Sequence, residues 1–442
     1  MPTRREFLSN AAVLSAGATL GMSARSYAQI VGANERMQFA VIGLNGRANA
    51  HLESLRANQK DARITYVCDV DEVILNRFAA RTEKVMGEPA KKEKDFRRML
   101  ESKDVDVITI ATPEHWHTPM AIAGMQAGKH VYVEKPCSHN PHECELIVAA
   151  QKKYGKKVQM GNQQRSSAHT KEIVGKIHDG LIGRAYYALA WYRNARKSMG
   201  IGKVIPVPAT LDWELWQGPA PRRPYKDNIH PYNWHWLKIY GTGEALNNGT
   251  HEVDVARWAL DVKWPETIRS SGGRYAYKDD WQFPDTQQVE FLYPGDKQIT
   301  WNSTSCNNAS LNNRDRGTQI FGTTGSVIVD RDGYEVFDIK GKRVDGYHVP
   351  RKGKTSSADT IGADSMTDTH FKNLINAIRV GEKLDSPIDE ASISVAILLM
   401  SNIAYDLKRE LKLNTANGAF VNDPAATKMR TRTYQKGWEI RI

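Results

Sequence analysis

The residues with the clearest chemical potential in this sequence lie between positions 241 and 260. The segment reads Gly-Thr-Gly-Glu-Ala-Leu-Asn-Asn-Gly-Thr-His-Glu-Val-Asp and leads into a good helix former. On a helix, Asn247 and His251 are four residues apart and share a face, and Asp254 lies near that face. A histidine beside a carboxylate can act as a general base or acid near neutral pH. The spacing therefore predicts an acid–base site on this segment.

A second chemical signal is the turn Gly-Leu-Asn-Gly-Arg-Ala at residues 43–48, which follows a β-rich run. Such a turn needs glycine because a side chain would keep the backbone away from a pyrophosphate, whose charge the helix N-terminal amides then receive. Asn45 stands at the usual middle glycine, and asparagine tolerates positive φ better than most residues. Asp69 follows the next β-like run, slightly beyond the spacing expected for an acid that holds the adenosine ribose. The pattern predicts a dinucleotide site that includes Gly43, Leu44, Asn45, Gly46, Arg47 and Asp69.

Aromatic side chains gather in the middle of the chain. Five of the 11 tryptophans fall between residues 191 and 236: Trp191, Trp213, Trp216, Trp234 and Trp236. Sugar rings pack their C–H faces on such surfaces, whereas the alternative is a tryptophan-rich core. The polar run Asn-Gln-Gln-Arg at 162–165 follows a strand and is typical of a substrate wall at a domain junction. We expect substrate contacts from Arg165, Trp191, Trp234, His235 and Trp236.

Metal and disulfide chemistry have weak support in the sequence. His115 and His117 are two residues apart, but no third ligand is obvious, so we expect no metal. Four cysteines in 442 residues exclude a disulfide-built scaffold, and the pairing of Cys137 with Cys144 stays open.

The elements that position these residues alternate between strand and helix in the first third of the chain. Strand-like runs cover 37–42, 63–68, 105–111, 130–133 and 157–160, and helices are expected at 49–57 and 118–127. This alternation predicts a Rossmann-type, doubly wound parallel sheet with helices on both faces. Ligands bind such sheets at the carboxyl ends of the strands, where Gly43, Asp69, Thr112 and Lys135 all fall.

The remainder of the chain predicts a second α/β domain with an open, largely antiparallel sheet. Strands are expected at 287–292, 298–303, 318–321 and 326–329, and helices at 365–380 and 390–409. The last helix is interpreted as amphipathic, with one apolar face formed by Ala391, Val395, Leu398, Leu399 and Ile403. The expected domains are 35–160 for the dinucleotide and 161–411 for substrate and oligomerisation. Residues 412–442 form a polar tail over the surface.

Composition narrows the class of protein. The net charge is +11, but the Lys and Arg residues are scattered and alternate with Asp and Glu. The sequence contains no nucleic-acid-binding motif, so no nucleic-acid partner is expected. The sequence contains no run of about 18 apolar residues, so no membrane span is expected. Residues 1–28 combine Arg4-Arg5 and Phe7-Leu8 with a short apolar stretch and small residues, which resembles a twin-arginine export signal. We expect a periplasmic or otherwise exported protein with the twin-arginine translocase as a partner; a Sec signal or a basic N-terminus is the alternative.

Four motifs together resemble the Gfo/Idh/MocA oxidoreductases: Val-Ile-Gly-x-x-Gly at 41–46, Cys-Asp-Val-Asp at 68–71, Ala-Thr-Pro-x-His-x-His at 111–117 and Glu-Lys-Pro at 134–136. The resemblance covers nearly all of residues 35–411. It implies an NAD(P)-dependent enzyme that acts on sugars or cyclitols, and a homo-oligomer such as a dimer or tetramer. It places Lys135 beside the nicotinamide and the reacting hydroxyl, with Thr112, Pro113, His117 and Glu134 on the cofactor side. Because no arginine follows Asp69, NAD is favoured over NADP.

The sequence departs from the family at one catalytic position. The family's acid in Gly-Gly-Gly-x-Leu-x-Asp-x-Gly-x-His falls on Asn247 here, and its histidine falls on His251. Asparagine cannot titrate, so it can position a hydroxyl but cannot relay a proton. Lys135 and His251 are then expected to carry the proton transfer.

Three functions are compatible with these observations. The first is hydride transfer between NAD(P) and a secondary hydroxyl of a sugar, cyclitol or sugar derivative. The second is an NAD-dependent glycosidase that oxidises a sugar transiently, eliminates the aglycone and reduces the sugar again. The third is a non-enzymatic sugar or dinucleotide sensor, because a fold does not fix a function.

Overall fold

The first sheet of the computed structural model, which describes residues 36–349 and 365–442, has six parallel strands in the order β3-β2-β1-β4-β5-β6. They are β1 (Met37–Ile42), β2 (Ala62–Cys68), β3 (Lys91–Glu93), β4 (Val107–Ile110), β5 (His130–Val133) and β6 (Val158–Met160). All four residues of β4 are buried, as expected for a parallel strand covered on both faces. The sheet confirms the predicted doubly wound arrangement.

The crossover helices begin and end at residues that suit those positions. They are α2 (Ala48–Ala57), α3 (Glu72–Met86), α4 (Phe96–Leu100), α5 (His117–Gln126) and α6 (Pro141–Tyr154). The Asp71 side chain accepts the backbone N–H of Val73 at the start of α3, and α6 begins in the same way at Asn140. Because the strands joined by these helices run parallel, the carboxyl ends of β1, β2, β4 and β5 lie at one edge of the sheet.

The second sheet is larger and mostly antiparallel, in the order β15-β14-β13-β12-β7-β10-β9-β8-β16, with β11 (Cys306–Asn307) paired to β7. The strands are β7 (Ala185–Ala195), β8 (Thr267–Gly273), β9 (Thr286–Tyr293), β10 (Lys297–Thr304), β12 (Arg316–Gly322), β13 (Gly325–Val329), β14 (Gly333–Asp338), β15 (Arg343–His348) and β16 (Leu411–Lys412). Only β7 and β10 run parallel to each other. The four strands expected from the sequence are present, and β7 adds the central strand that the sequence reading left out.

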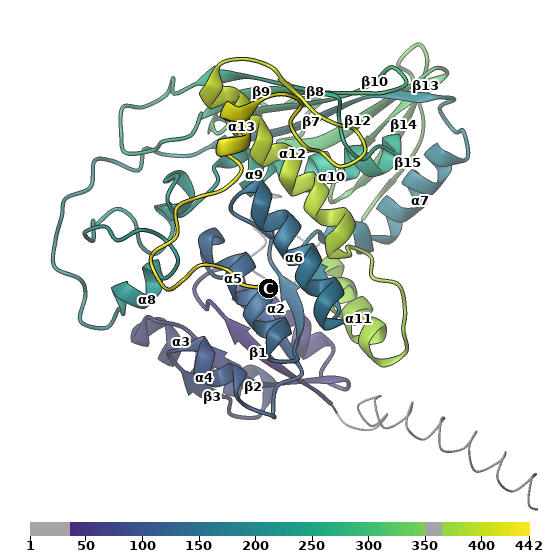
Figure 1. The fold of residues 1–442 in the computed structure, drawn as a ribbon. Helices are drawn as coiled ribbons and strands as arrows, with labels where there is room; N and C mark the ends of the chain where they lie inside the picture. The colour runs from purple at the N-terminus through teal and green to yellow at the C-terminus, as the bar shows by residue number, and fades with distance from the viewer. Residues whose placement is uncertain (1–35, 350–364) are drawn as a thin grey trace, which may run out of the picture.

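Helices pack between the two sheets (Figure 1), among them α7 (Ala168–His178), α10 (Gly249–Leu260) and α12 (Ile388–Leu407). The expectation that α12 is amphipathic is wrong: 14 of its 20 residues are buried, on several faces, because it lies between α6 and β8. By length and composition, α12 could also cross a membrane, but 78% of its apolar window is buried inside the protein, as in the core helix of a globular domain.

The chain returns to the first sheet after building the second. Helix α11 (Ser365–Arg379) packs against α2, and its Phe371 ring stacks on Tyr132 of β5 with centroids 4.4 Å apart. Phe371, Leu374 and Ile375 thereby join the hydrophobic cluster of β1 and α2. The parallel sheet is therefore completed by residues more than 200 positions downstream of its last strand.

The C-terminal tail also returns to the first domain, and it lies near α5 (Figure 1). After the short helix α13 (Pro424–Lys428), Arg432 and Tyr434 bind the buried Glu143 carboxylate, at 2.8 and 2.7 Å. Trp438 packs edge-on against Trp116 with centroids 5.0 Å apart. The tail thus lies over the surface and is anchored by specific contacts.

The four cysteines, Cys68, Cys137, Cys144 and Cys306, are free thiols, which answers the question left open for Cys137 and Cys144. The export signal expected at residues 1–28 lies outside the described residues.

Candidate functional site

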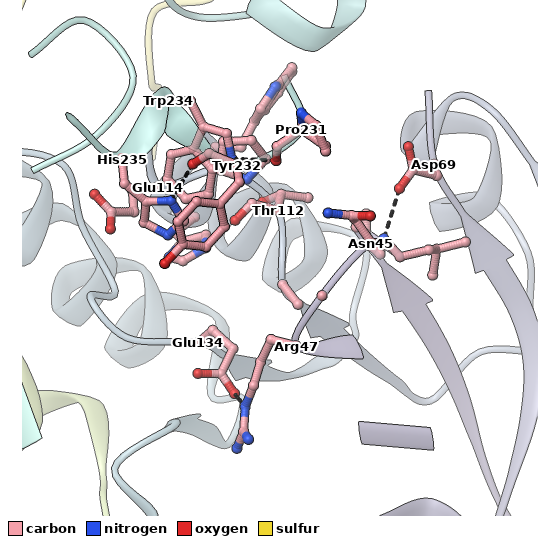
Figure 2. Close-up of a pocket in the computed structure, with 18 of the residues that line it drawn as sticks. Asn45, Arg47, Asp69, Thr112, Glu114, Glu134, Pro231, Tyr232, Trp234 and His235 are labelled. Atoms are coloured by element: carbon pink, nitrogen blue, oxygen red, sulfur yellow. Dashed lines mark hydrogen bonds and ion pairs between the residues drawn. The ribbon is translucent and has the colours of Figure 1, made fainter. Parts of the chain in front are cut away.

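A cavity of about 510 Å³ opens at the carboxyl ends of β1, β2, β4 and β5. Figure 2 shows Asn45 and Asp69 at one end of the cavity, and Tyr232, Trp234 and His235 near Glu114 at the other end. The ion pair of Arg47 and Glu134 lies apart from both groups. Its lining includes most of the residues expected from the sequence: Gly43, Leu44, Asn45, Gly46, Arg47, Asp69, Thr112, Pro113, His117, Glu134, Lys135, Trp234, His235, Asn247 and His251.

The glycine turn between β1 and α2 fits the backbone of a dinucleotide. Gly43 has φ of +81°, and a Cβ there would lie 2.6 Å from the Thr112 nitrogen, so only glycine allows this close approach. A Cβ on Gly46 would meet no atom within 4 Å, which leaves open space beside the uncapped N-terminus of α2. Asn45 is absent from the positive-φ residues of the described chain, so the turn does not use the conformational tolerance that we expected of it.

Asp69 lies directly after β2 at the same edge of the cavity. The Leu44 N–H donates to its Oδ2 at 2.7 Å and the Asp71 N–H donates to its Oδ1 at 2.9 Å. Burial raises the pKa of Asp69 to about 6, against the effect of these hydrogen bonds, so the carboxyl is mostly ionised at neutral pH. The residues present therefore fit an adenosine ribose and pyrophosphate at this end.

Glu134 anchors the floor of the cavity. Its Oε1 accepts the Arg47 Nε–H at 2.8 Å and lies 2.9 Å from Nε2 of the buried His51. Burial alone would raise the pKa of Glu134, but the Arg47 charge and the two hydrogen bonds hold it well below its usual range. Arg47 is thus held by Glu134, and it also donates to Thr367 Oγ1 of α11 at 3.1 Å.

The Lys135 amine is held by position 247. Its Nζ donates to the Asn247 backbone oxygen at 2.6 Å and to the Asn247 Oδ1 at 3.1 Å. Burial lowers the pKa of Lys135 to about 8, against the opposing charges of Glu134 and Glu114. An amine with this pKa can exchange a proton near neutral pH.

His251 lies beside this pair but lacks the carboxylate that we expected. The helix of residues 244–260 breaks at Asn248 into α9 (Glu244–Asn247) and α10, so Asn247 and His251 meet across a break. Asp254 instead accepts two hydrogen bonds from Arg165, at 2.7 and 3.0 Å, and one from Ser394. The pKa of His251 is far below its ordinary value because of burial and nearby cations, and its Nδ1 has no hydrogen-bond partner in the described chain. His251 is therefore neutral at physiological pH.

The aromatic residues divide between cavity and core. Trp216, Tyr232, Trp234 and His235 line the cavity, and the Trp234 and His235 rings are stacked 3.5 Å apart. Trp191, fully buried, donates to the Arg314 carbonyl, and Trp236 stacks on Trp281. The structure places Trp191, Trp236 and Arg165, which were expected to contact the substrate, outside the lining of the cavity.

His117 lies at the junction between the cofactor end and the Glu-Lys-Pro turn. Its ring nitrogens are 2.6 Å from the Pro136 carbonyl oxygen and 2.9 Å from that of Thr112. Burial lowers the pKa of His117, and a neutral imidazole carries a single N–H. The ring therefore lies between two backbone segments that frame the cavity and donates to only one of the two carbonyl oxygens. Among the described residues, no group of three or more His, Cys, Asp or Glu side chains is arranged to hold a metal.

Sequence reasoning missed several residues of the lining, above all Glu114, Arg196 and Arg316. Arg196 forms an ion pair with Glu244 at 2.7 Å, and Arg316 pairs with Glu252 at 2.6 Å. Glu114 had a usable signal, because it lies within the Ala-Thr-Pro-x-His-x-His motif. Arg196 directly follows β7 and Arg316 begins β12, and no local pattern marks them.

Two family models match the sequence. Residues 37–162 match the GFO_IDH_MocA oxidoreductase family, NAD-binding Rossmann fold, and residues 175–328 match the GFO/IDH/MocA C-terminal domain. The chain is also similar to a glycosyl hydrolase family 109 protein of Saccharopolyspora erythraea, with 36% identity over 165 residues, which are 36% of each chain. Inositol 2-dehydrogenase of Rubrobacter xylanophilus is 24% identical over 299 residues, 67% of this chain and 72% of that protein.

Solved structures share the fold. The WlbA dehydrogenase of Bordetella pertussis, in complex with NADH and UDP-GlcNAcA, has a TM-score of 0.64 at 18% identity, covering 86% of this chain and 99% of that one. The sequence matches span less than half of the length of the first curated relatives, between 36% and 45%.

Proposed function

Because the chain belongs to the Gfo/Idh/MocA oxidoreductase family, we propose that it transfers a hydride between NAD and a secondary hydroxyl of a sugar, cyclitol or sugar derivative. The observation that carries the proposal is the Lys135 amine, which has a lowered pKa and is held by Asn247 in the cavity that holds the dinucleotide turn. The NAD-binding Rossmann domain supplies the cofactor end of this cavity.

Each part of the cavity has a place in this reaction. The turn at Gly43 and Gly46 and the N-terminus of α2 would hold the pyrophosphate, and Asp69 would hold the ribose. When bound, NAD accepts the hydride from the carbon that carries the hydroxyl. A carboxylate at Asp69 repels a 2′-phosphate, which favours NAD over NADP.

Lys135 is the proton acceptor of the proposal. In the oxidation direction, its neutral amine takes the hydroxyl proton as the C–H bond breaks, and the resulting ammonium donates to the two oxygens of Asn247. His251 is neutral and serves as a hydrogen-bonding partner for the hydroxyl. Oxidation is therefore expected to become faster as pH rises through about 8, the pKa of Lys135.

The substrate class follows from the other end of the cavity. Trp216, Trp234 and Tyr232 offer flat apolar faces there, and Asn247, Asn248 and Gln163 offer amide groups. This combination suits a ring with C–H faces and several hydroxyls.

The variant Lys135→Ala tests this proposal. We expect kcat for sugar oxidation to fall by about 10²–10⁴-fold, because general base catalysis is lost, while the affinity for NAD stays unchanged. Turnover is measured by NADH absorbance over a panel of sugars and cyclitols, and NAD binding by calorimetry. Lys152→Ala, an exposed lysine of α6, is the matched control. Unchanged turnover in the Lys135 variant would contradict the proposal.

A glycosidase that oxidises its sugar transiently is the second candidate, supported by the similarity to glycosyl hydrolase family 109 proteins. It would use the same Lys135 and NAD but leave the cofactor oxidation state unchanged over a full cycle. Release of an aglycone from a glycoside without net NADH would favour this function. Net NADH formation without cleavage would favour the dehydrogenase.

Export and oligomerisation are proposed as well. The twin-arginine pair Arg4-Arg5 supports a periplasmic location, which replacement of both residues by lysine should abolish in cell fractionation.

The open antiparallel sheet supports a homodimer or homotetramer, which light scattering on the purified protein would test.

A further inference from the structure

Glu114 is a buried carboxyl group at the substrate end of the cavity. It begins the short helical turn Glu114–Trp116 after Pro113, its residue is 2% exposed, and it lines the cavity together with Lys135. Within the described residues, its side-chain hydrogen bond comes from the uncharged Thr242, whose Oγ1 donates to Oε2 at 2.5 Å. Figure 2 shows Glu114 near His235 and Thr112.

The other carboxylates around Lys135 are already matched by cations. Glu134 holds Arg47 and His51, and Glu244 of α9 holds Arg196. At position 247, the amine meets only neutral oxygens. Glu114 forms no ion pair with any residue that the structure describes, so its charge is available to the lysine.

The charges of these groups act on one another. Burial raises the pKa of Glu114 to about 7, the Glu244 charge raises it further, and Thr242 and Lys135 oppose this. Glu134 and then Glu114 raise the pKa of Lys135 against the effect of burial, whereas Arg331 and Arg47, the ion-pair partner of Glu134, lower it. The neutral rings of His115, His117 and His235 complete the surroundings, since burial lowers the pKa of all three.

We propose that Glu114 is the buried counter-ion of Lys135, a positioning residue that supplies the negative charge that Asn247 lacks and sets the pH range in which the lysine exchanges a proton. The inference rests on the proposed function for its catalytic meaning. The charge coupling itself is a property of the resting protein.

The test measures the titration of Lys135 in Glu114→Gln. Trace labelling with acetic anhydride across pH, quantified by peptide mass spectrometry, gives the midpoint for the Lys135 amine in the full-length protein without any substrate. We expect the midpoint to fall by about one pH unit, because the opposite charge that favours the ammonium is gone. The wild-type titration should extend over two coupled steps, and that of the variant should be a single step. Glu410→Gln, an exposed surface carboxylate, should leave the midpoint unchanged.

Two further variants guard against a merely structural effect. The double variant Glu114→Gln/Asn247→Asp moves the carboxylate to the other side of the amine and should restore the wild-type midpoint. Thr242→Val removes the hydrogen bond that favours ionised Glu114 and should shift the midpoint downward by a smaller amount.

The outcomes separate the two proposals. The proposal that Glu114 is the counter-ion is overturned if the Lys135 midpoint is unchanged in Glu114→Gln. It is also overturned if the double variant does not recover the wild-type midpoint. If the midpoint shifts as expected but no sugar is turned over, the role of Glu114 as counter-ion is supported and the proposed function fails. If turnover is found, the rising limb of kcat/KM against pH should move with the labelling midpoint in every variant.

Discussion

Asn247 holds the Lys135 amine through two neutral oxygens, one from the backbone and one from the side chain. A carboxylate at this position would stabilise the ammonium, whereas an amide positions the same nitrogen without that charge. The lowered pKa of Lys135, about 8, reflects burial that these neutral contacts do not offset. At this position, the side chain positions the lysine amine and leaves the stabilisation of its charge to other groups.

The variant Asn247→Asp tests this at the residue scale. The added negative charge should raise the pKa of Lys135 by about one unit, so the rising limb of the oxidation pH profile should move to higher pH. Oxidation at pH 7 should fall by up to about tenfold, with unchanged NAD affinity. The measurement is kcat/KM between pH 6 and 10, and a limb that stays in place would show that Asn247 does not hold the amine in solution.

At the scale of elements, the β1–α2 turn depends on two glycines for different reasons. Gly43 has positive φ and lies against the backbone of Thr112 at the end of β4. Gly46 has open space around its Cα on the cavity side, beside the start of α2. The first glycine lets two strand ends approach, and the second leaves room for a ligand.

Replacing each glycine by alanine should separate these effects. Gly43→Ala should lower the free energy of unfolding by about 1–3 kcal/mol, because of its positive φ and close contact. Gly46→Ala should retain the wild-type Tm but lose at least about tenfold in NAD affinity, because its methyl group fills the pyrophosphate space. Thermal unfolding and calorimetry measure the two quantities. Equal loss of stability in both variants would contradict the different roles.

At the scale of the whole molecule, the cavity is completed by parts of the chain that lie far apart in sequence. The cofactor end comes from residues 42–135, and the arginines of the wall come from strands and loops of the second sheet. Helix α11 and the C-terminal tail return to the first domain and tie the two sheets together. A dinucleotide in this cavity would contact groups from both domains.

Mass spectrometry of whatever the purified, denatured protein releases tests the cofactor at this scale. We expect NAD or NADH rather than NADP, because the Asp69 carboxylate lines the cavity and would repel a 2′-phosphate. A stoichiometric amount that survives dialysis would favour the self-regenerating glycosidase. An empty site that binds NAD weakly would favour the dehydrogenase, or a sensor if no sugar is turned over. Release of NADP would contradict the role given to Asp69.

Much of this site was predictable because its residues belong to local patterns. The parallel strands are apolar runs that end at the cavity, so Gly43, Asp69, Thr112 and Lys135 could be placed at one edge. Asn247 and His251 also reach the cavity, although the helix that was expected to align them is broken at Asn248.

Other predictions failed where pairing between distant residues decides the outcome. Asp254 was expected near His251, but Arg165, which lies 89 positions earlier, holds its carboxylate. Trp191 is buried against the neighbouring strand β12, with its Nε1–H bound to the carbonyl of Arg314. The polar residues of α12, such as Ser392 and Ser394, suggested a solvent-facing side, but they are buried as well.

The sequence by itself determined the parallel sheet, the glycine turn and the positions of Asp69 and Lys135 after the ends of strands. These features follow from hydrophobic periodicity and from residue types whose chemistry depends on short spacing. Only the tertiary structure decided which charges face Lys135, because Glu134 and Glu244 are matched by Arg47 and Arg196 from other elements. A buried charge is stabilised or shifted by whatever group lies within a few ångströms, and that neighbour is set by packing between segments far apart in the chain.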